Sequence, residues 1–249
     1  MEHIHSLSDA VLALDSLLSI DLDNYLGTGG SDQDKCGQLW VASQTVYQAA
    51  QYSFPTVAFT PDEGDYVIEL KGSNDKIGAV MLRVDAVYIA HTALRNGDGE
   101  IGLLSPAEFD ERCPTWRKRG VEQDTGRPTY ACVLPDRSLA FDRPFDAETA
   151  ADTDGLYLSG PGYPRPFVFD TLSEAEWEVD ERLRWAVVKR AAYSAGSPFA
   201  RSGPTVQTLA RYLVESETDV RAFLDDQGDI SSPFSGSAPR RYPSTFRAF

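Results

Sequence analysis

The sequence predicts an α+β protein with three parts. These are an antiparallel bundle of four main helices, an antiparallel β-domain (sandwich or barrel) inserted within it, and an extended C-terminal tail. Apolar residues recur at helical spacing near both ends of the chain, a period of two prevails in the middle, and the last stretch has no period. We therefore expect residues 1–54 and 171–227 to form the bundle, 55–170 the β-domain with one short helix, and 228–249 the tail.

The N-terminal half of the bundle consists of two predicted helices. Residues 7–18 carry leucines and a valine at helical spacing, and a serine, Ser6 or Ser8, is placed to cap them. A glycine-rich loop leads to a second helix that begins near residues 31–32. This helix ends before Pro55, because the residue ahead of a proline is pushed out of the α region.

Alternating apolar and polar residues indicate strands throughout the β-domain, and turn-forming residues separate them as in antiparallel sheets. The expected strands are residues 66–70, 82–88, 129–134, 138–141, 156–159 and 165–169, the last two flanking Gly160-Pro161-Gly162. Ser105 is expected to cap the short helix, with Pro106 at its first position and Glu108 completing a capping box.

The C-terminal half of the bundle consists of two more amphipathic helices. Ser173 and Glu176 form a predicted capping box for the first, and the second runs from near Pro204 to Gly228. Each of the four helices is too short to be stable alone, so we expect them to bury their apolar stripes against one another.

The formal net charge of −15 disfavours binding to nucleic acid through its phosphates, which requires clustered lysine and arginine. It is compatible with a surface that DNA passes without sticking, and equally with simple solubility. Cys36, Cys113 and Cys132 are an odd number without close pairing, which indicates buried thiols in a reducing compartment. We expect no signal peptide and no membrane span, and folding in a cytoplasm.

No residue pattern selects a catalytic site, a cofactor or a metal centre. His3 lies third from a free amine, a geometry that can chelate copper or nickel, but an ordinary N-terminus is the simpler interpretation. The acidic stretches at Asp21–Asn24 and Asn96–Glu100 lack the bidentate glutamate of an EF-hand and are read as turns, with a weak cation site left open. We expect neither an enzyme nor a cofactor-binding protein.

The tail combines arginines with aromatic residues between prolines. From Gly228 onward, three arginines against one aspartate give a charge of +2, which leaves −17 for the first 227 residues. Such anchors in a segment that folds on contact are typical of a docking peptide, although a disordered end or a tail lying back on its own acidic domain are alternatives. The predicted docking residues are Phe234, Arg240, Arg241, Tyr242, Phe246, Arg247 and Phe249.

The order of several short motifs resembles the head-to-tail connector proteins (adaptor, or head-completion proteins) of tailed bacteriophages. The residues that carry the resemblance are Leu104–Asp110, Pro114-Thr115-Trp116, Gly126–Tyr130, Leu139, Pro144 and Thr171–Ala195, leading into a last helix that ends near Asp225. The resemblance covers residues 8–227 and is densest from 104 to 227. The chain departs from the family pattern at Asp142–Asp146 and in the added stretch 147–154.

The resemblance implies a structural virion protein, made in the host cytoplasm and located in the neck between capsid and tail. It implies a homo-oligomeric ring of about twelve copies beneath the portal protein, with a downstream tail or terminator protein below and DNA passing through the lumen without sequence-specific binding. The tail would grip the portal. Two alternatives stay open: a peripheral tail β-module that binds host-surface sugar or another tail protein, and a carbohydrate-active or hydrolytic enzyme.

Overall fold

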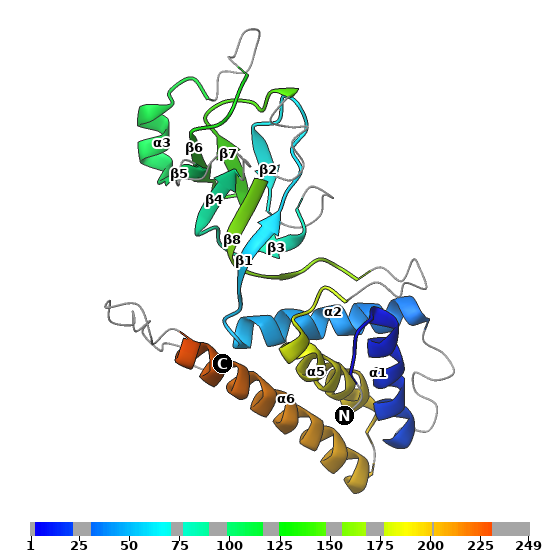
Figure 1. The fold of residues 1–249 in the computed structure, drawn as a ribbon. Helices are drawn as coiled ribbons and strands as arrows, with labels where there is room; N and C mark the ends of the chain where they lie inside the picture. The colour runs from blue at the N-terminus through cyan, green and yellow to red at the C-terminus, as the bar shows by residue number, and fades with distance from the viewer. Residues whose placement is uncertain are drawn as a thin grey trace.

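The computed structural model describes residues 3–21, 31–70, 77–89, 99–116, 125–147, 156–167, 177–200 and 202–230 (Figure 1). The α-helices are α1 (Leu7–Asp21), α2 (Asp32–Ala49), α3 (Pro106–Arg112), α5 (Arg184–Gly196) and α6 (Gly203–Ile230), and short 3₁₀ turns lie at η1 (Glu181–Leu183) and η2 (Ser197–Phe199). The strands are β1 (Ser53–Ala58), β2 (Val67–Glu69), β3 (Ala79–Met81), β4 (Ala86–Ile89), β5 (Glu100–Leu104), β6 (Tyr130–Val133), β7 (Ser138–Phe141) and β8 (Leu156–Pro164).

The predicted fold class, an antiparallel four-helix bundle with an inserted antiparallel β-domain, is wrong. The described residues form five α-helices and a mixed, curled sheet of eight strands. Most residues of α5 are buried, including Arg184 and Lys189, and α1, α2 and α6 all pack against it. A helix that is buried on most sides is a central helix, whereas the corner helix of a bundle buries one apolar stripe. Figure 1 shows α1 lying across α2 and not alongside it.

Helix starts are set by local capping, as the sequence indicated. Ser6 caps α1 and Ser31 caps α2. At α3 the Glu108 amide donates to Ser105 Oγ at 3.4 Å, and the Ser105 amide donates to Glu108 Oε2 at 3.1 Å, which confirms the capping box.

Two predicted helix boundaries are wrong. Trp177–Asp180 precede the first helical turn, so the helix does not start at Ser173, which lies outside the described residues. Asp180 caps η1 instead, by accepting from the Arg182 amide at 3.0 Å. At the other end α6 continues through Gly228 to Ile230, since glycine weakens a helix without ending it unless the backbone turns left-handed.

The sheet is mixed because one neighbouring pair is parallel. The strand order is β1-β8-β4-β5-β6-β7-β2, with β3 pairing β8 off this path. β5 and β6 run parallel, and α3 lies in the connection between them, since a parallel pair needs a crossover. The other pairs are antiparallel, and the predicted hairpin from residues 129–134 to 138–141 is confirmed as β6–β7.

β8 is one continuous strand, where the sequence predicted two strands and a turn at Gly160-Pro161-Gly162. It pairs with β1, β3 and β4. A Cβ on Gly160 would lie 2.3 Å from the Arg83 carbonyl oxygen, and one on Gly162 would lie 2.5 Å from the Val80 carbonyl oxygen. Glycine is therefore required at these two positions because two backbones lie close together there, and not because the chain reverses direction.

The two faces of the sheet differ. Side chains of the inner face, such as Val57, Val87, Ile101 and Leu158, meet in one apolar core. On the outer face α3 contacts β5 and β6, and Phe109 and Trp116 pack over Cys132 of β6 and Ala140 of β7. β4 and β8 make no contact of this extent with α3.

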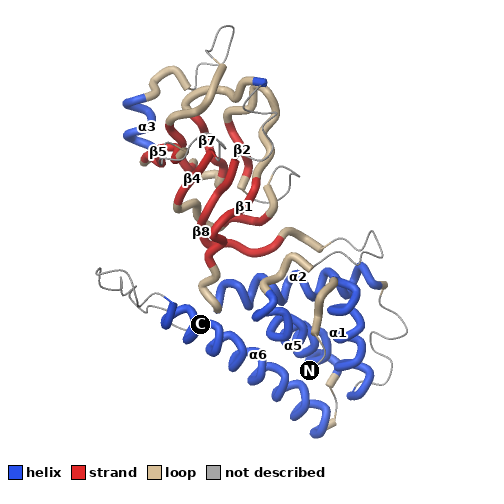
Figure 2. The backbone as a smooth tube through the Cα atoms, in the orientation of Figure 1, coloured by secondary structure: helices blue, strands red, loops and turns tan. Residues whose placement is uncertain are grey.

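The helical part (α1, α2, α5 and α6) and the sheet part (β1–β8 and α3) meet where β1 and β8 approach α2 (Figure 2). Trp40 Nε1 of α2 donates to the Pro164 carbonyl oxygen at 3.0 Å, and Tyr163 packs against the helical core. The expected boundaries at residues 54, 170 and 227 stay predictions. No helix among the described residues is both long and apolar enough to cross a membrane.

Candidate functional site

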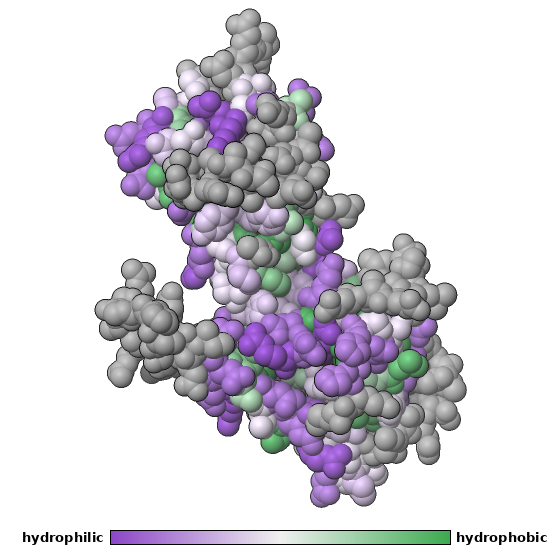
Figure 3. Space-filling model, in the orientation of Figure 1, coloured by the Kyte–Doolittle hydropathy of each residue, from purple (hydrophilic) through white to green (hydrophobic). Residues whose placement is uncertain are grey.

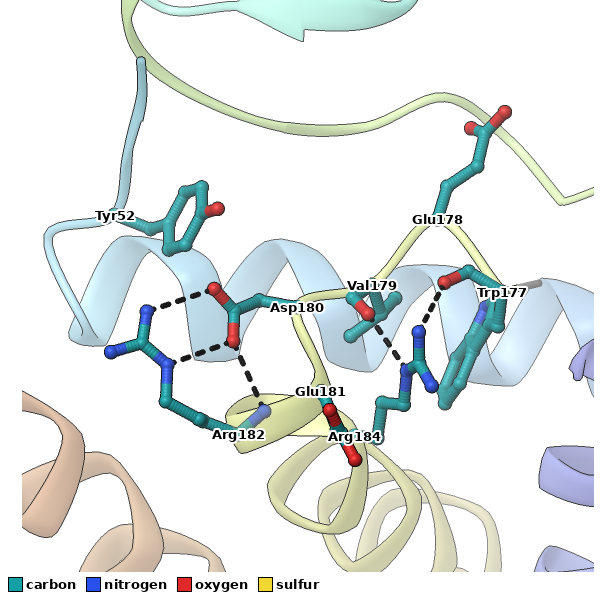
Figure 4. Close-up of a pocket in the computed structure, with 8 residues that line it drawn as sticks. All are labelled: Tyr52, Trp177, Glu178, Val179, Asp180, Glu181, Arg182 and Arg184. Atoms are coloured by element: carbon teal, nitrogen blue, oxygen red, sulfur yellow. Dashed lines mark hydrogen bonds and ion pairs between the residues drawn. The ribbon is translucent and has the colours of Figure 1, made fainter. Parts of the chain in front are cut away.

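An open pocket with acidic and aromatic walls lies where the chain enters α5. We call it the acidic pocket (Figure 4). It has a volume of about 610 Å³. It is lined by Tyr52, Trp177, Glu178, Val179, Asp180, Glu181, Arg182 and Arg184.

A buried arginine fixes the wall of this pocket. Arg184 is 4% exposed, and its guanidinium donates to the carbonyl oxygens of Val179 and Ile4 at 2.9 Å and of Trp177 at 3.0 Å. The Trp177 amide in turn donates to the His5 carbonyl oxygen at 2.9 Å. Three bonds from one planar group hold the irregular segment before η1 against the N-terminal segment, because the fork of arginine donors is rigid.

A second arginine sits at the mouth of the pocket and engages one of its carboxylates. Arg182 Nε and Nη2 donate to the two oxygens of Asp180 at 3.1 and 3.0 Å. Partial burial disfavours the charged form of Asp180, but the hydrogen bonds and charge of Arg182 outweigh it and hold the pKa of this carboxyl below its usual value. At neutral pH Asp180 is therefore ionised and already paired with Arg182.

An aromatic residue of the pocket wall, Tyr52, packs against Phe223 of α6. The Arg182 guanidinium lies 4.5 Å from the Phe223 ring centroid, and Tyr52 stacks on the same ring at 5.8 Å. Burial raises the pKa of the Tyr52 hydroxyl, and the nearby Asp180 carboxylate raises it further, so Tyr52 stays a neutral ring with a polar tip.

The pocket is suited to a cation next to a ring. Glu178 and Glu181 are exposed at its rim, whereas both arginines are engaged. Trp177 is 3% exposed, and its Nε1 is buried without a hydrogen-bond partner among the described residues. Because this Nε1 atom is buried from solvent, it lies within the wall and not on the open surface of the pocket. Exposed carboxylates lack the buried setting that a general acid needs, so the arrangement favours binding over proton transfer.

A second feature is a row of tyrosines on the outer face of the sheet. Tyr88 of β4, which is 39% exposed, pairs directly with Tyr157 of β8. Tyr130 lies on the same face, with its ring over Gly102, where a Cβ would come within 3.0 Å of it. We call Tyr88, Tyr130 and Tyr157 the tyrosine face. Flat aromatic surfaces of this kind stack on sugars or on apolar parts of proteins.

A third feature is a stripe of exposed apolar side chains on α6, called the α6 patch, together with single exposed apolar side chains on α1 and α2. Leu12 of α1 is 66% exposed and Val41 of α2 is 52% exposed, while Val206 and Val214 of α6 are 50% and 59% exposed. α5 lies between α6 and α1 (Figure 1). On the face shown in Figure 3, small apolar areas stand among polar surface on the helical part.

The predicted docking residues of the tail, Phe234, Arg240, Arg241, Tyr242, Phe246, Arg247 and Phe249, lie outside the described residues. The acidic pocket was missed because its segment, residues 177–183, was assigned to an amphipathic helix. The alternation of two apolar residues with three acids in Trp177–Glu181 was the available signal, since it has period two and not 3.6.

The other candidate groups form no reactive cluster in the described part of the chain. No three histidine, cysteine or acidic side chains gather there in a way that could hold a metal ion. His3 stacks on His5 with ring centroids 5.6 Å apart, and its Nδ1 lies 3.7 Å from Glu181 Oε1. Cys36 and Cys132 are buried, and burial raises the pKa of the Cys36 thiol to about 11.

No protein-family model matches this chain, and no curated protein matches its sequence.

Proposed function

We propose that this chain is a structural virion protein of a tailed bacteriophage, a ring-forming adaptor that joins the portal protein to the tail and extends the DNA channel. The motif order from Leu104 to Ala195 supports the family. The single observation of structure that favours a ring is the exposure of apolar side chains on helices on either side of α5.

The α6 patch has the geometry of a helix contact. Val206, Ala210 and Val214 follow one another at a spacing of four, so they lie one above the other on the exposed side of α6. On the opposite side of α6, Leu209 and Tyr212 are buried in the helical core. Helices that pack against each other commonly do so through an apolar stripe of this spacing. The α6 patch can therefore contact a helix of a second copy.

Exposed apolar side chains on different helices favour a head-to-tail contact. If the patch on α6 meets the exposed Leu12 of α1 in the next copy, one such surface stays free at each end of the pair. Repetition of such a heterologous contact closes into a ring if the rotation permits. A ring of about twelve copies, the portal above and a terminator or tail protein below belong to the family that the sequence resembles. A net charge of −15 per chain suits a channel from which DNA must leave.

The test is the oligomeric state of the full chain, measured by light scattering after size exclusion, with and without the portal ring. Val214→Glu is expected to raise the concentration at which the assembly dissociates at least tenfold, because a buried carboxylate costs several kcal/mol and about 1.4 kcal/mol corresponds to tenfold. Ala222→Glu adds the same charge to an exposed position of α6 outside the patch and is expected to leave the assembly unchanged. A chain that stays monomeric in the presence of the portal contradicts the proposal.

The tyrosine face favours a second candidate, a peripheral tail β-module that binds host-surface sugar. Tyr88 and Tyr157 are cross-strand neighbours on β4 and β8, strands that make no extensive contact with α3, and a pyranose ring stacks on neighbouring aromatic rings of this kind. A monomer that binds a glycan array, and loses binding on Tyr88→Ala, favours this candidate over the ring.

A further inference from the structure

We propose that the acidic pocket is a receptor for the chain's own C-terminal tail, with Arg240 and Arg241 at its rim and the neighbouring Tyr242 against Tyr52. The ligand is an arginine-containing aromatic peptide, and the occupant is intramolecular. This inference does not depend on the ring proposed above.

Charge complementarity is the first argument. Beyond Ile230 the chain holds three arginines and no acidic residue. The pocket offers Glu178 and Glu181 at its exposed rim, while Asp180 is already bound by Arg182. A guanidinium forms two parallel hydrogen bonds to one carboxylate, so an arginine pair matches the two exposed rim carboxylates, of which only Glu181 has a nearby imidazole, His3 Nδ1 at 3.7 Å.

The chemistry of the walls is the second argument. Tyr52 lines the pocket and stacks on Phe223 of α6, and the Arg182 guanidinium lies 4.5 Å from the centroid of that Phe223 ring. A planar cation therefore already packs beside aromatic rings at this place, and the exposed edge of Tyr52 offers the same kind of contact to an arginine or tyrosine of the tail.

The starting point of the tail is the third argument. Tyr52 of the pocket wall stacks on Phe223 of α6, and from Phe223 the helix continues for seven residues to Ile230, a rise of about 10 Å. The ten residues from Ile230 to Arg240 can span up to about 33 Å. The chain can therefore return to the pocket, and a short tether gives an effective concentration on the order of millimolar.

The experiment places a photo-crosslinker in the full chain as Tyr242→p-benzoylphenylalanine and maps the products by mass spectrometry. Crosslinks are expected at Tyr52 or within Trp177–Arg182. Glu178→Gln with Glu181→Gln is expected to lower their yield at least threefold, because it removes both rim carboxylates. The matched pair Glu100→Gln with Glu217→Gln neutralises two exposed acids elsewhere and is expected to leave the yield unchanged.

Mixing isotopically labelled and unlabelled chains separates the possible occupants. Crosslinked peptides that carry one label only, at a yield independent of dilution, support the intramolecular contact. Mixed-label products that vanish on dilution show that the tail of a second copy occupies the pocket and overturn the proposal. Crosslinks outside the pocket, or a yield that ignores the loss of both glutamates, overturn it as well.

Discussion

At the scale of single residues, Arg184 determines the shape of the acidic pocket without contacting its solvent-exposed rim. The guanidinium is buried and satisfies three carbonyl oxygens from two segments that are far apart in sequence. The segment Trp177–Asp180 has no regular structure of its own, so these bonds replace the hydrogen bonds that a helix or strand would supply. The sequence revealed nothing of this role, because a lone arginine in an apolar stripe carries no local sign of the carbonyls it will reach.

Arg184→Met is expected to destabilise the protein by on the order of 3 kcal/mol, since it keeps the apolar stem and leaves buried carbonyls without donors. Urea unfolding of the full chain measures the loss. Arg182→Met is the control: its side chain is 44% exposed, so loss of its ion pair is expected to cost about 1 kcal/mol or less. Equal losses in the two variants would show that the carbonyl contacts of Arg184 are not the reason for its burial.

At the scale of elements, the sequence succeeded where structure is local and failed where it is not. The capping box at Ser105 and the β6–β7 hairpin depend on residues within a few positions of one another, and both were predicted. The glycines of β8 were read as a turn, because glycine marks turns and close backbone approaches alike and only the neighbouring strand distinguishes them. The parallel β5–β6 pair was missed although strand, helix and strand follow in order, which is the pattern of a crossover.

Gly160→Ala is expected to destabilise the sheet part strongly, on the order of 3 kcal/mol or more. The new Cβ would lie 2.3 Å from a backbone oxygen, and the φ of +145° is one that alanine avoids. Gly78→Ala is the matched control in the same sheet, since its Cβ would meet neighbours at an ordinary 3.7 Å. Thermal unfolding followed by circular dichroism compares the two, and a Gly160 variant as stable as the Gly78 variant would exclude a close approach at β8.

At the scale of the whole molecule, the proposals involve two kinds of contact, one between copies and one between tail and pocket, on a protein that is acidic overall. The α6 patch is apolar, whereas the pocket and the tail attract each other through charge. The sequence indicated the charge asymmetry between the tail and the rest of the chain, but not the surface that the tail would meet. It also predicted four equivalent helices, because the periodicity of α5 alone does not show that three other helices surround it.

Salt is therefore expected to act in opposite directions on the two contacts. Raising the salt concentration from 0.1 to 1 M shortens the screening length from about 10 to about 3 Å, which weakens repulsion between chains of net charge −15 and leaves apolar burial in place. Light scattering should then show the assembly dissociating at a severalfold lower concentration, while the yield of the tail crosslink falls over the same range. Val214→Glu should abolish the first response and leave the second intact. If salt instead disperses the assembly, ion pairs hold the copies together and the α6 patch is not the contact.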